Sequence, residues 1–138
     1  MVENPLAASN SPLSGIILPS GIAFYLEESE PFARWILRGD IDAAKAAAEA
    51  LGVTIPVTPC DAAHADDRAA LWLGPDEWLL LAGIEEKAVL QAQLEMALQP
   101  LAHSLVDVSH RQIGLSITGA NAARALSAGC PLDFYRTA

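Results

Sequence analysis

The chain has 138 residues, of which 52% are hydrophobic and 18% charged, and its formal net charge is −9. This composition favours a folded protein with a core of its own and argues against a disordered chain. The acidic balance excludes nucleic acid and anionic membranes as expected partners, because both attract Lys and Arg. The chain begins without basic residues and has no apolar run of membrane-spanning length, so we expect a cytoplasmic protein.

The N-terminal part of the sequence predicts an arm followed by a single domain. Residues 1–20 contain three prolines among small polar residues, which is typical of an extended and flexible arm. Residues 21–138 are then expected to form one domain. Within it, alternation of apolar and polar residues predicts strands over 21–27 and 33–38.

A helix and a less regular segment are predicted after these two strands. Asp40 is placed to cap a helix over 41–51, and Gly52 is placed to end it. The segment 53–58 is strand-like but contains a proline, which favours either an edge strand or a plain loop. A polar loop is predicted over 59–67.

The middle of the chain predicts a hairpin and a second helix. Two strand-like runs, 69–73 and 78–82, flank a turn that begins with Gly-Pro-Asp. A helix is predicted over about 85–99, because an apolar stripe recurs at helical spacing and a proline limits its end. This stripe consists of Leu90, Leu94, Ala97 and Leu101.

The stretch 104–134 predicts two more strands and a short helix. Apolar and polar residues alternate over 112–118, and Gly119 breaks that strand. The helix after it is rich in small residues and can lie close against a sheet, with Gly129 in the left-handed position past its end. The order strand-strand-helix thus occurs three times. It predicts an α+β fold, a mainly antiparallel sheet with helices on one face.

One predicted loop gathers five residues of metal-binding types: Cys60, Asp61, His64, Asp66 and Asp67. Their spacing matches no standard zinc pattern, so a solvated loop is the expected structure and no metal site is predicted. The sequence has no glycine-rich phosphate loop or dinucleotide fingerprint, so we predict no cofactor-binding residue. Cys60 and Cys130 could form one disulfide, but reduced thiols are the expected state in a cytoplasmic protein.

Asp107, Ser109 and His110 are the residue types of a nucleophilic triad. In a strand, Asp107 and Ser109 point to one side and His110 to the other, so the three cannot form the required hydrogen-bond chain. We therefore predict no catalytic residue here. Asp107 or Ser109 is expected instead to bond the backbone of a turn where the two strands meet.

Three tryptophans stand out in a chain that has few aromatic residues. Core packing is one interpretation of Trp35, Trp72 and Trp78. Trp and Arg are also frequent at the centres of protein interfaces. Trp35 with its neighbours Arg34 and Arg38 is therefore the candidate interface.

Two motifs carry a resemblance to known proteins over roughly residues 70–133. The first resembles the start of the aminomethyltransferase (glycine-cleavage T-protein) fold. It consists of Asp-Val-Ser-His at 107–110, a strand ending in Thr-Gly at 118–119 and the Ala-rich helix. The closing Gly-Cys-Pro-Leu-Asp at 129–133 adds a narrower likeness. Together with Leu-Trp-Leu-Gly-Pro-Asp-Glu-Trp-Leu-Leu-Leu at 71–81, it resembles the gamma-subunit family of heterotetrameric sarcosine oxidase.

The resemblance implies a non-catalytic subunit that docks onto larger alpha and beta subunits, beside a delta subunit. Such a complex oxidatively demethylates sarcosine to glycine with folate as the one-carbon acceptor. It is expected to use FAD, FMN, NAD and tetrahydrofolate, none of them bound by this chain. The fold implied is the N-terminal part of the aminomethyltransferase folate-binding fold, with the domain incomplete at its C-terminus.

Two other functions stay open at this point. One is a stand-alone folate-binding or aminomethyltransferase-like domain, although the pattern that holds folate in those enzymes lies beyond the matched segment. The other is an interaction module unrelated to sarcosine. The mean hydropathy of +0.29 is high for a lone domain and indicates a surface that expects a partner. We therefore expect the isolated chain to self-associate, for example as a homodimer, where native partners are missing.

Overall fold

The computed structural model describes residues 11–19, 21 and 23–134. Its contacts divide the chain into two compact units, residues 1–30 with 113–138 and residues 31–112, called here the first and the second unit. The first ten residues of the predicted arm lie outside the described residues. Ser11–Gly15 form a turn in which the backbone N–H of Ser14 donates to the carbonyl of Ser11 at 3.0 Å.

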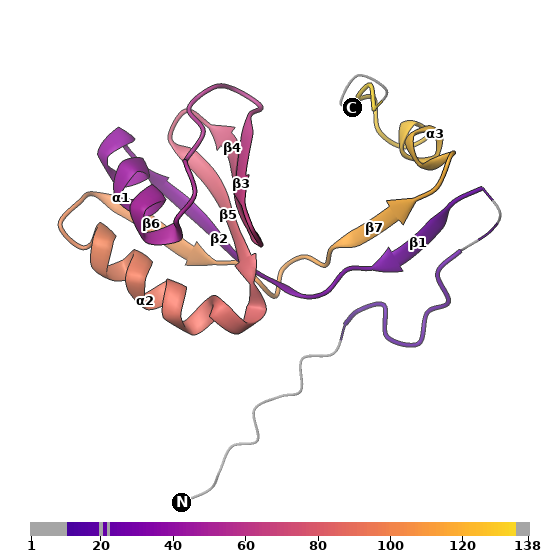
Figure 1. The fold of residues 1–138 in the computed structure, drawn as a ribbon, viewed down its shortest axis with the longest axis horizontal. Coiled ribbons are helices and arrows are strands. Elements are labelled where there is room, and N and C mark those ends of the chain that lie inside the picture. The colour runs from indigo at the N-terminus through magenta and orange to yellow at the C-terminus, as the bar shows by residue number, and fades with distance from the viewer. Residues whose placement is uncertain (1–10, 20, 22, 135–138) are drawn as a thin grey trace, which may run out of the picture. The chain divides into compact units, whose positions relative to one another are not determined.

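The second unit contains a five-stranded sheet in the order β3-β4-β5-β2-β6, in which every neighbouring pair is antiparallel (Figure 1). The strands are β2 (Phe32–Gly39), β3 (Ala62–Ala65), β4 (Arg68–Gly74), β5 (Glu77–Gly83) and β6 (His103–Asp107). The central strands β2, β4 and β5 contain the predicted runs and extend them by a residue or two. This arrangement confirms the predicted antiparallel α+β architecture.

One strand lies where the sequence predicts a polar loop. β3 falls within 59–67 and pairs with β4, so that Ala62 lies opposite Leu71 and Ala65 opposite Arg68. An edge strand needs only backbone hydrogen bonds on one side, so it does not require the apolar alternation that marks buried strands. The segment 53–58 forms no strand. It is a loop that buries Val53 and Ile55 against the core.

The helix α1 (Ile41–Leu51) has the predicted bounds. The carboxylate of Asp40 accepts hydrogen bonds from the backbone N–H groups of Asp42 and Ala43, which confirms it as the N-cap. Gly52 ends the helix in the left-handed conformation with a φ of 74°. The sequence therefore determined both ends of this helix locally.

The second helix, α2 (Lys87–Leu98), follows a short 3-10 turn (Ile84–Glu86). Its fully buried residues are Leu90, Leu94 and Leu98. Leu98 replaces Ala97 in the predicted stripe, because the larger side chain at that end of the helix fills the core and Ala97 stays half-buried. Leu101 packs at the margin of the core.

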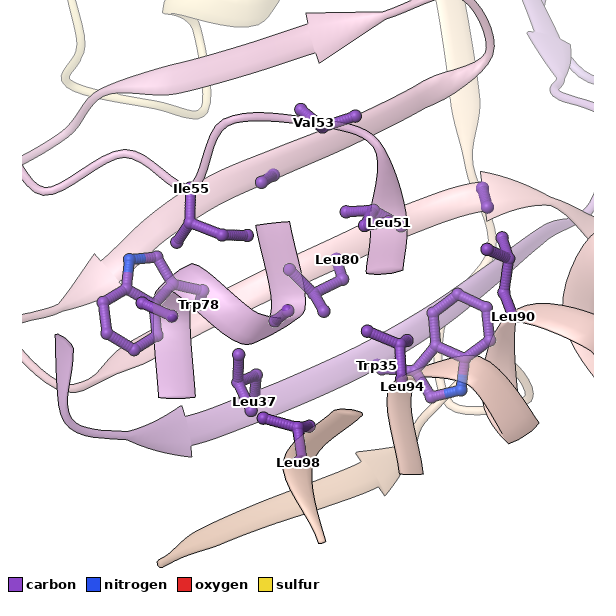
Figure 2. Packing of buried hydrophobic residues seen from close by; sticks show 14 of the residues in the cluster. Trp35, Leu37, Leu51, Val53, Ile55, Trp78, Leu80, Leu90, Leu94 and Leu98 are labelled. Carbon is purple, nitrogen blue, oxygen red and sulfur yellow. The ribbon is translucent and has the colours of Figure 1, made fainter. Parts of the chain in front are cut away.

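Both helices cover the same face of the five-stranded sheet (Figure 1). On β2, Ala33, Trp35 and Leu37 are 0% exposed and point toward the helices, as the period of two in a strand requires. Figure 2 shows Trp35 beside Leu94 and Leu90, with Trp78 at the other end of the cluster. The small residues of α1 let it approach closely: a Cβ added at Gly39 would lie 2.6 Å from the Cβ of Ala43.

The first unit contains a two-stranded antiparallel ribbon and a short helix. β1 (Tyr25–Glu28) pairs with β7 (Leu115–Thr118), and α3 (Ala122–Ser127) follows. β1 begins later than predicted, and only the last part of 112–118 is a strand. Gly119 ends β7 with a φ of 111°, and a Cβ there would lie 3.0 Å from the carbonyl oxygen of Ala23, so only glycine fits.

One prediction for this unit is wrong. Gly129 does not take the left-handed conformation, because Ala128 caps α3 in the right-handed helical region and the N–H of Gly129 donates to the carbonyl of Leu126. None of the residues of α3 is buried, and close packing of its small residues against a sheet stays a prediction.

Arg68 joins three elements of the second unit. Its Nε and Nη2 donate to the two carboxylate oxygens of Glu86 at 3.1 and 2.5 Å, and its Nη1 donates to the carbonyl of Leu51 at 2.8 Å. These bonds lower the pKa of Glu86 and raise that of Arg68. The third bond satisfies a carbonyl at the C-terminus of α1, where a cation is favoured.

We expect Arg68→Lys to lower the free energy of unfolding by about 1 kcal/mol, because an ammonium group cannot make the forked contact and the carbonyl bond together. Urea denaturation followed by circular dichroism measures this loss. The matched control is Arg38→Lys, since Arg38 is exposed and forms a single 3.6 Å ion pair with Glu77, which contributes little. Equal losses in the two variants would show that the bonds of Arg68 to Glu86 and Leu51 contribute no more to stability than an exposed ion pair.

Candidate functional site

A polar cluster lies at the end of β6 in the second unit. The Oδ1 of Asp107 accepts hydrogen bonds from the backbone N–H of Ser109 at 2.9 Å and from its hydroxyl at 2.6 Å. Its Oδ2 lies 2.6 Å from the Nζ of Lys87 on α2. The Ser109 hydroxyl oxygen in turn accepts from the backbone N–H of Arg34 at 3.0 Å. The cluster therefore ties the end of β6 to β2 and to α2.

The carboxylate of Asp107 is ionised over almost the whole pH range. Partial burial by itself would raise its pKa, but the hydrogen bonds from Lys87 and Ser109 outweigh burial and lower the pKa to about 2. Such a group does not accept or release a proton near neutral pH, so it is unsuited to acid–base catalysis.

The cluster also lacks the arrangement of a nucleophilic triad. Ser109 is 8% exposed and its hydroxyl already donates to Asp107, while His110 is an exposed turn residue. Asp107 bonds turn backbone as predicted, but the turn does not join two paired strands. β6 pairs with β2 of the second unit, and β7 pairs with β1 of the first.

Arg34, a predicted interface residue, is 8% exposed and holds the segment that follows β6. Its backbone carbonyl accepts from the N–H of Val108 at 2.8 Å, and its Nη1 donates to the carbonyl of Gln112 at 3.0 Å. Together with the bond from its N–H to Ser109, these bonds use its backbone N–H, its carbonyl and its Nη1 within the chain.

The other two predicted interface residues differ in exposure. Trp35 is 0% exposed, and its indole N–H donates to the side-chain oxygen of Gln91 on α2, so it presents no surface to a partner. The core-packing interpretation therefore holds for Trp35, as for Trp78. Arg38 has an exposed side chain beside Glu77, and its role in an interface stays a prediction.

Large apolar side chains are exposed in both units, but the first unit, which sequence reasoning did not single out as an interface, differs in its lack of a core among the described residues. Every buried residue among those described lies between Ala33 and Ser109, in the second unit. Large apolar side chains exposed in the first unit are Ile16, Ile17, Tyr25, Ile113, Leu115, Leu126 and Leu132. The alternation over 112–118 was the available signal, since it predicts a strand with one apolar and one polar face.

The predicted solvated loop around His64 is in part the β3–β4 hairpin. Among the described residues, no three His, Cys, Asp or Glu side chains are grouped so that they could hold a metal ion. Cys60 and Cys130 are free thiols. None of the helices in the part of the chain that the structure describes has the length and apolarity needed to cross a bilayer.

The fold defines the class of protein. It resembles the glycine cleavage system aminomethyltransferase T from Bartonella henselae with a TM-score of 0.61 at 13% identity, covering 77% of this chain and 32% of that one. A chain of the heterotetrameric sarcosine oxidase from Corynebacterium sp. U-96, in complex with pyrrole 2-carboxylate, is more similar. Its TM-score is 0.74 at 32% identity, covering 83% of this chain and 60% of that chain. The protein thus has an aminomethyltransferase-like α+β fold.

The sequence comparisons give the family. The model of the sarcosine oxidase gamma subunit family matches residues 38–137, and the chain belongs to this family. Sarcosine oxidase subunit gamma from Corynebacterium sp. (strain U-96) is 37% identical over 91 residues, which is 65% of this chain and 43% of that protein. The corresponding subunit from strain P-1 is 36% identical over 91 residues, 65% of this chain and 44% of that protein. The matched segment is therefore less than half the length of these relatives.

Proposed function

We propose that the chain is a docking subunit of a heterotetrameric sarcosine oxidase and takes no part in the chemistry. Membership of the gamma-subunit family supports this, since the structurally similar chain comes from such a complex. The observation that carries the docking role is the absence of any buried residue from the described part of the first unit. A segment with exposed apolar residues and no core of its own requires another surface to cover it.

A non-catalytic role is supported by the polar cluster at Asp107. Its carboxylate, hydroxyl and ammonium groups bond one another, and none is placed as a base beside a free nucleophile. The cluster instead holds the segment that follows β6 against β2 and α2.

The reaction of the complex is proposed to be oxidative demethylation of sarcosine to glycine, with folate as the one-carbon acceptor. Its cofactors would be FAD, FMN, NAD and tetrahydrofolate. In the described residues, no buried side-chain nitrogen or oxygen lacks a hydrogen-bond partner, so no unpaired polar group indicates a binding site for any of these cofactors. We therefore place these cofactors on the other subunits, alpha, beta and delta, in a cytoplasmic complex.

Co-expression tests this proposal. We expect the tagged chain to co-purify with the alpha, beta and delta subunits of the sarcosine oxidase from the same source. The chain purified alone is expected to be colourless and to consume no oxygen with sarcosine. The measurement is the visible absorbance and subunit composition after size-exclusion chromatography. Flavin absorbance in the isolated chain, or its failure to co-purify with any subunit, would contradict the proposal.

Titration with tetrahydrofolate separates this function from the stand-alone folate-binding alternative. We expect no binding by the isolated chain in isothermal titration calorimetry. Micromolar or tighter affinity would favour the alternative, because a specific polar pocket is needed to reach it.

A further inference from the structure

We infer that the apolar face of the β1–β7 ribbon docks onto a partner protein whose surface is apolar and flanked by Lys or Arg. This inference rests on the proposed function and names the surface that the docking uses. The register places Leu26 opposite Ile117 and Glu28 opposite Leu115, so these four side chains share one face, called here the ribbon face. The opposite face carries Tyr25, Glu27, Ser116 and Thr118.

The ribbon cannot be stabilised by its own packing. Leu115 is 50% exposed, and Leu26 and Ile117 are only half-buried. An isolated two-stranded ribbon is marginally stable in water, and three or more strands or a packed layer are needed for independent stability. Among the described residues, β1 and β7 pair only with each other, so each keeps one edge on which no described strand lies. A partner can therefore cover the ribbon face and add a strand to an edge.

The charges around the ribbon indicate which partner fits. Glu27, Glu28 and Glu30 take part in none of the four ion pairs found between described residues from Arg38 to Asp107. Glu28 lies on the ribbon face itself. A partner with Lys or Arg beside an apolar patch would pair with this carboxylate. A second copy of the chain would place acidic groups against each other, and like charges disfavour that contact.

The test measures binding of the full chain to the complex of alpha, beta and delta subunits purified without it. We expect Leu115→Asp to weaken binding roughly tenfold or more, since it places a charge in the apolar centre of the contact. The matched control is Ser116→Asp on the opposite face of the same strand, with a change below about twofold. Because all three tryptophans lie in the second unit, unchanged tryptophan fluorescence confirms that this unit is folded in both variants.

A charge reversal tests the chemistry of the partner. We expect Glu28→Lys to weaken binding several-fold in low salt and less in high salt, since salt screens exposed charges. Glu27→Lys, one residue away on the other face, is the control and should have the smaller effect. Equal effects at both positions would overturn the assignment of the ribbon face.

The outcomes separate this inference from the proposed function. If the wild-type chain binds none of the subunits, the proposed function fails and the inference with it. If the wild type binds and Leu115→Asp binds equally well, only the inference fails. A dimer through the ribbon that the subunits cannot displace would identify a second copy of the chain as the occupant, and the inference would be wrong. The inference would also be wrong if the chain is a monomer whose ribbon amides are already protected from hydrogen exchange, because the chain would then cover the ribbon itself.

Discussion

Replacing Trp35 by alanine is expected to lower the free energy of unfolding of the second unit by about 3–5 kcal/mol. The side chain is 0% exposed and packs between the central strand β2 and the helix α2. Its removal leaves a cavity that the surrounding sheet and helix cannot close, and it also removes the indole N–H that donates to the side-chain oxygen of Gln91. Since domains are stable by about 5–15 kcal/mol, this loss threatens the fold. Urea denaturation followed by far-ultraviolet circular dichroism measures it.

The matched control for this prediction is Trp72→Ala. Trp72 lies on β4 of the same sheet, which β5 separates from β2, and it is only half-buried at the margin of the core, so we expect a smaller loss. A Trp35→Ala chain with wild-type stability that no longer binds the other subunits would restore the interface interpretation. Where Trp35→Ala proves insoluble, Trp35→Phe gives the same comparison with a smaller cavity.

The second large effect is expected from Asp107→Asn, which should destabilise the second unit by about 1–2 kcal/mol at pH 7. The depressed pKa of about 2, against an ordinary 3.8, means that ionised Asp107 stabilises the folded state. This range is reduced for solvent screening, because the side chain is 36% exposed. The variant removes the charge that Lys87 contacts at 2.6 Å.

The stabilisation by Asp107 should decrease as the pH falls. The folded pKa lies below the unfolded one, so the contribution of Asp107 is complete above about pH 4 and disappears as the pH falls toward 2. The stabilities of wild type and Asp107→Asn should therefore converge over that range in acid. Asp42→Asn is the control, since Asp42 forms an exposed pair with Lys45 and should change little. A difference that stays constant down to pH 2 would exclude an ionic origin.

A cycle with Lys87→Met separates the ion pair from the hydrogen bonds to Ser109. We expect the double variant to lose less than the sum of the two single losses, because both single changes break the same contact. Strict additivity would show that Asp107 acts through Ser109 alone.

The sequence by itself determined the elements that depend on local physics. Asp40 and Gly52 mark both ends of α1 because capping involves only neighbouring backbone groups. The two strand-like runs on either side of residues 74–77 predict a hairpin, because so short a turn brings the runs together as antiparallel neighbours. The motifs within 71–81 and 107–133 also indicated the gamma-subunit family that the comparisons confirm.

Only the tertiary structure decided which residues are buried and which strands pair. Trp35 lies in the core because β2 occupies the centre of the sheet, and no local pattern places it there. β6 and β7 are close in sequence, but they pair with β2 and β1 in different sheets, so their sequence spacing predicts no hairpin between them. The exposed ribbon face has the alternation of a buried strand, because alternation records that a face is apolar and not what covers it. Whether a face is covered depends on contacts between distant segments or between chains, which a single sequence does not record.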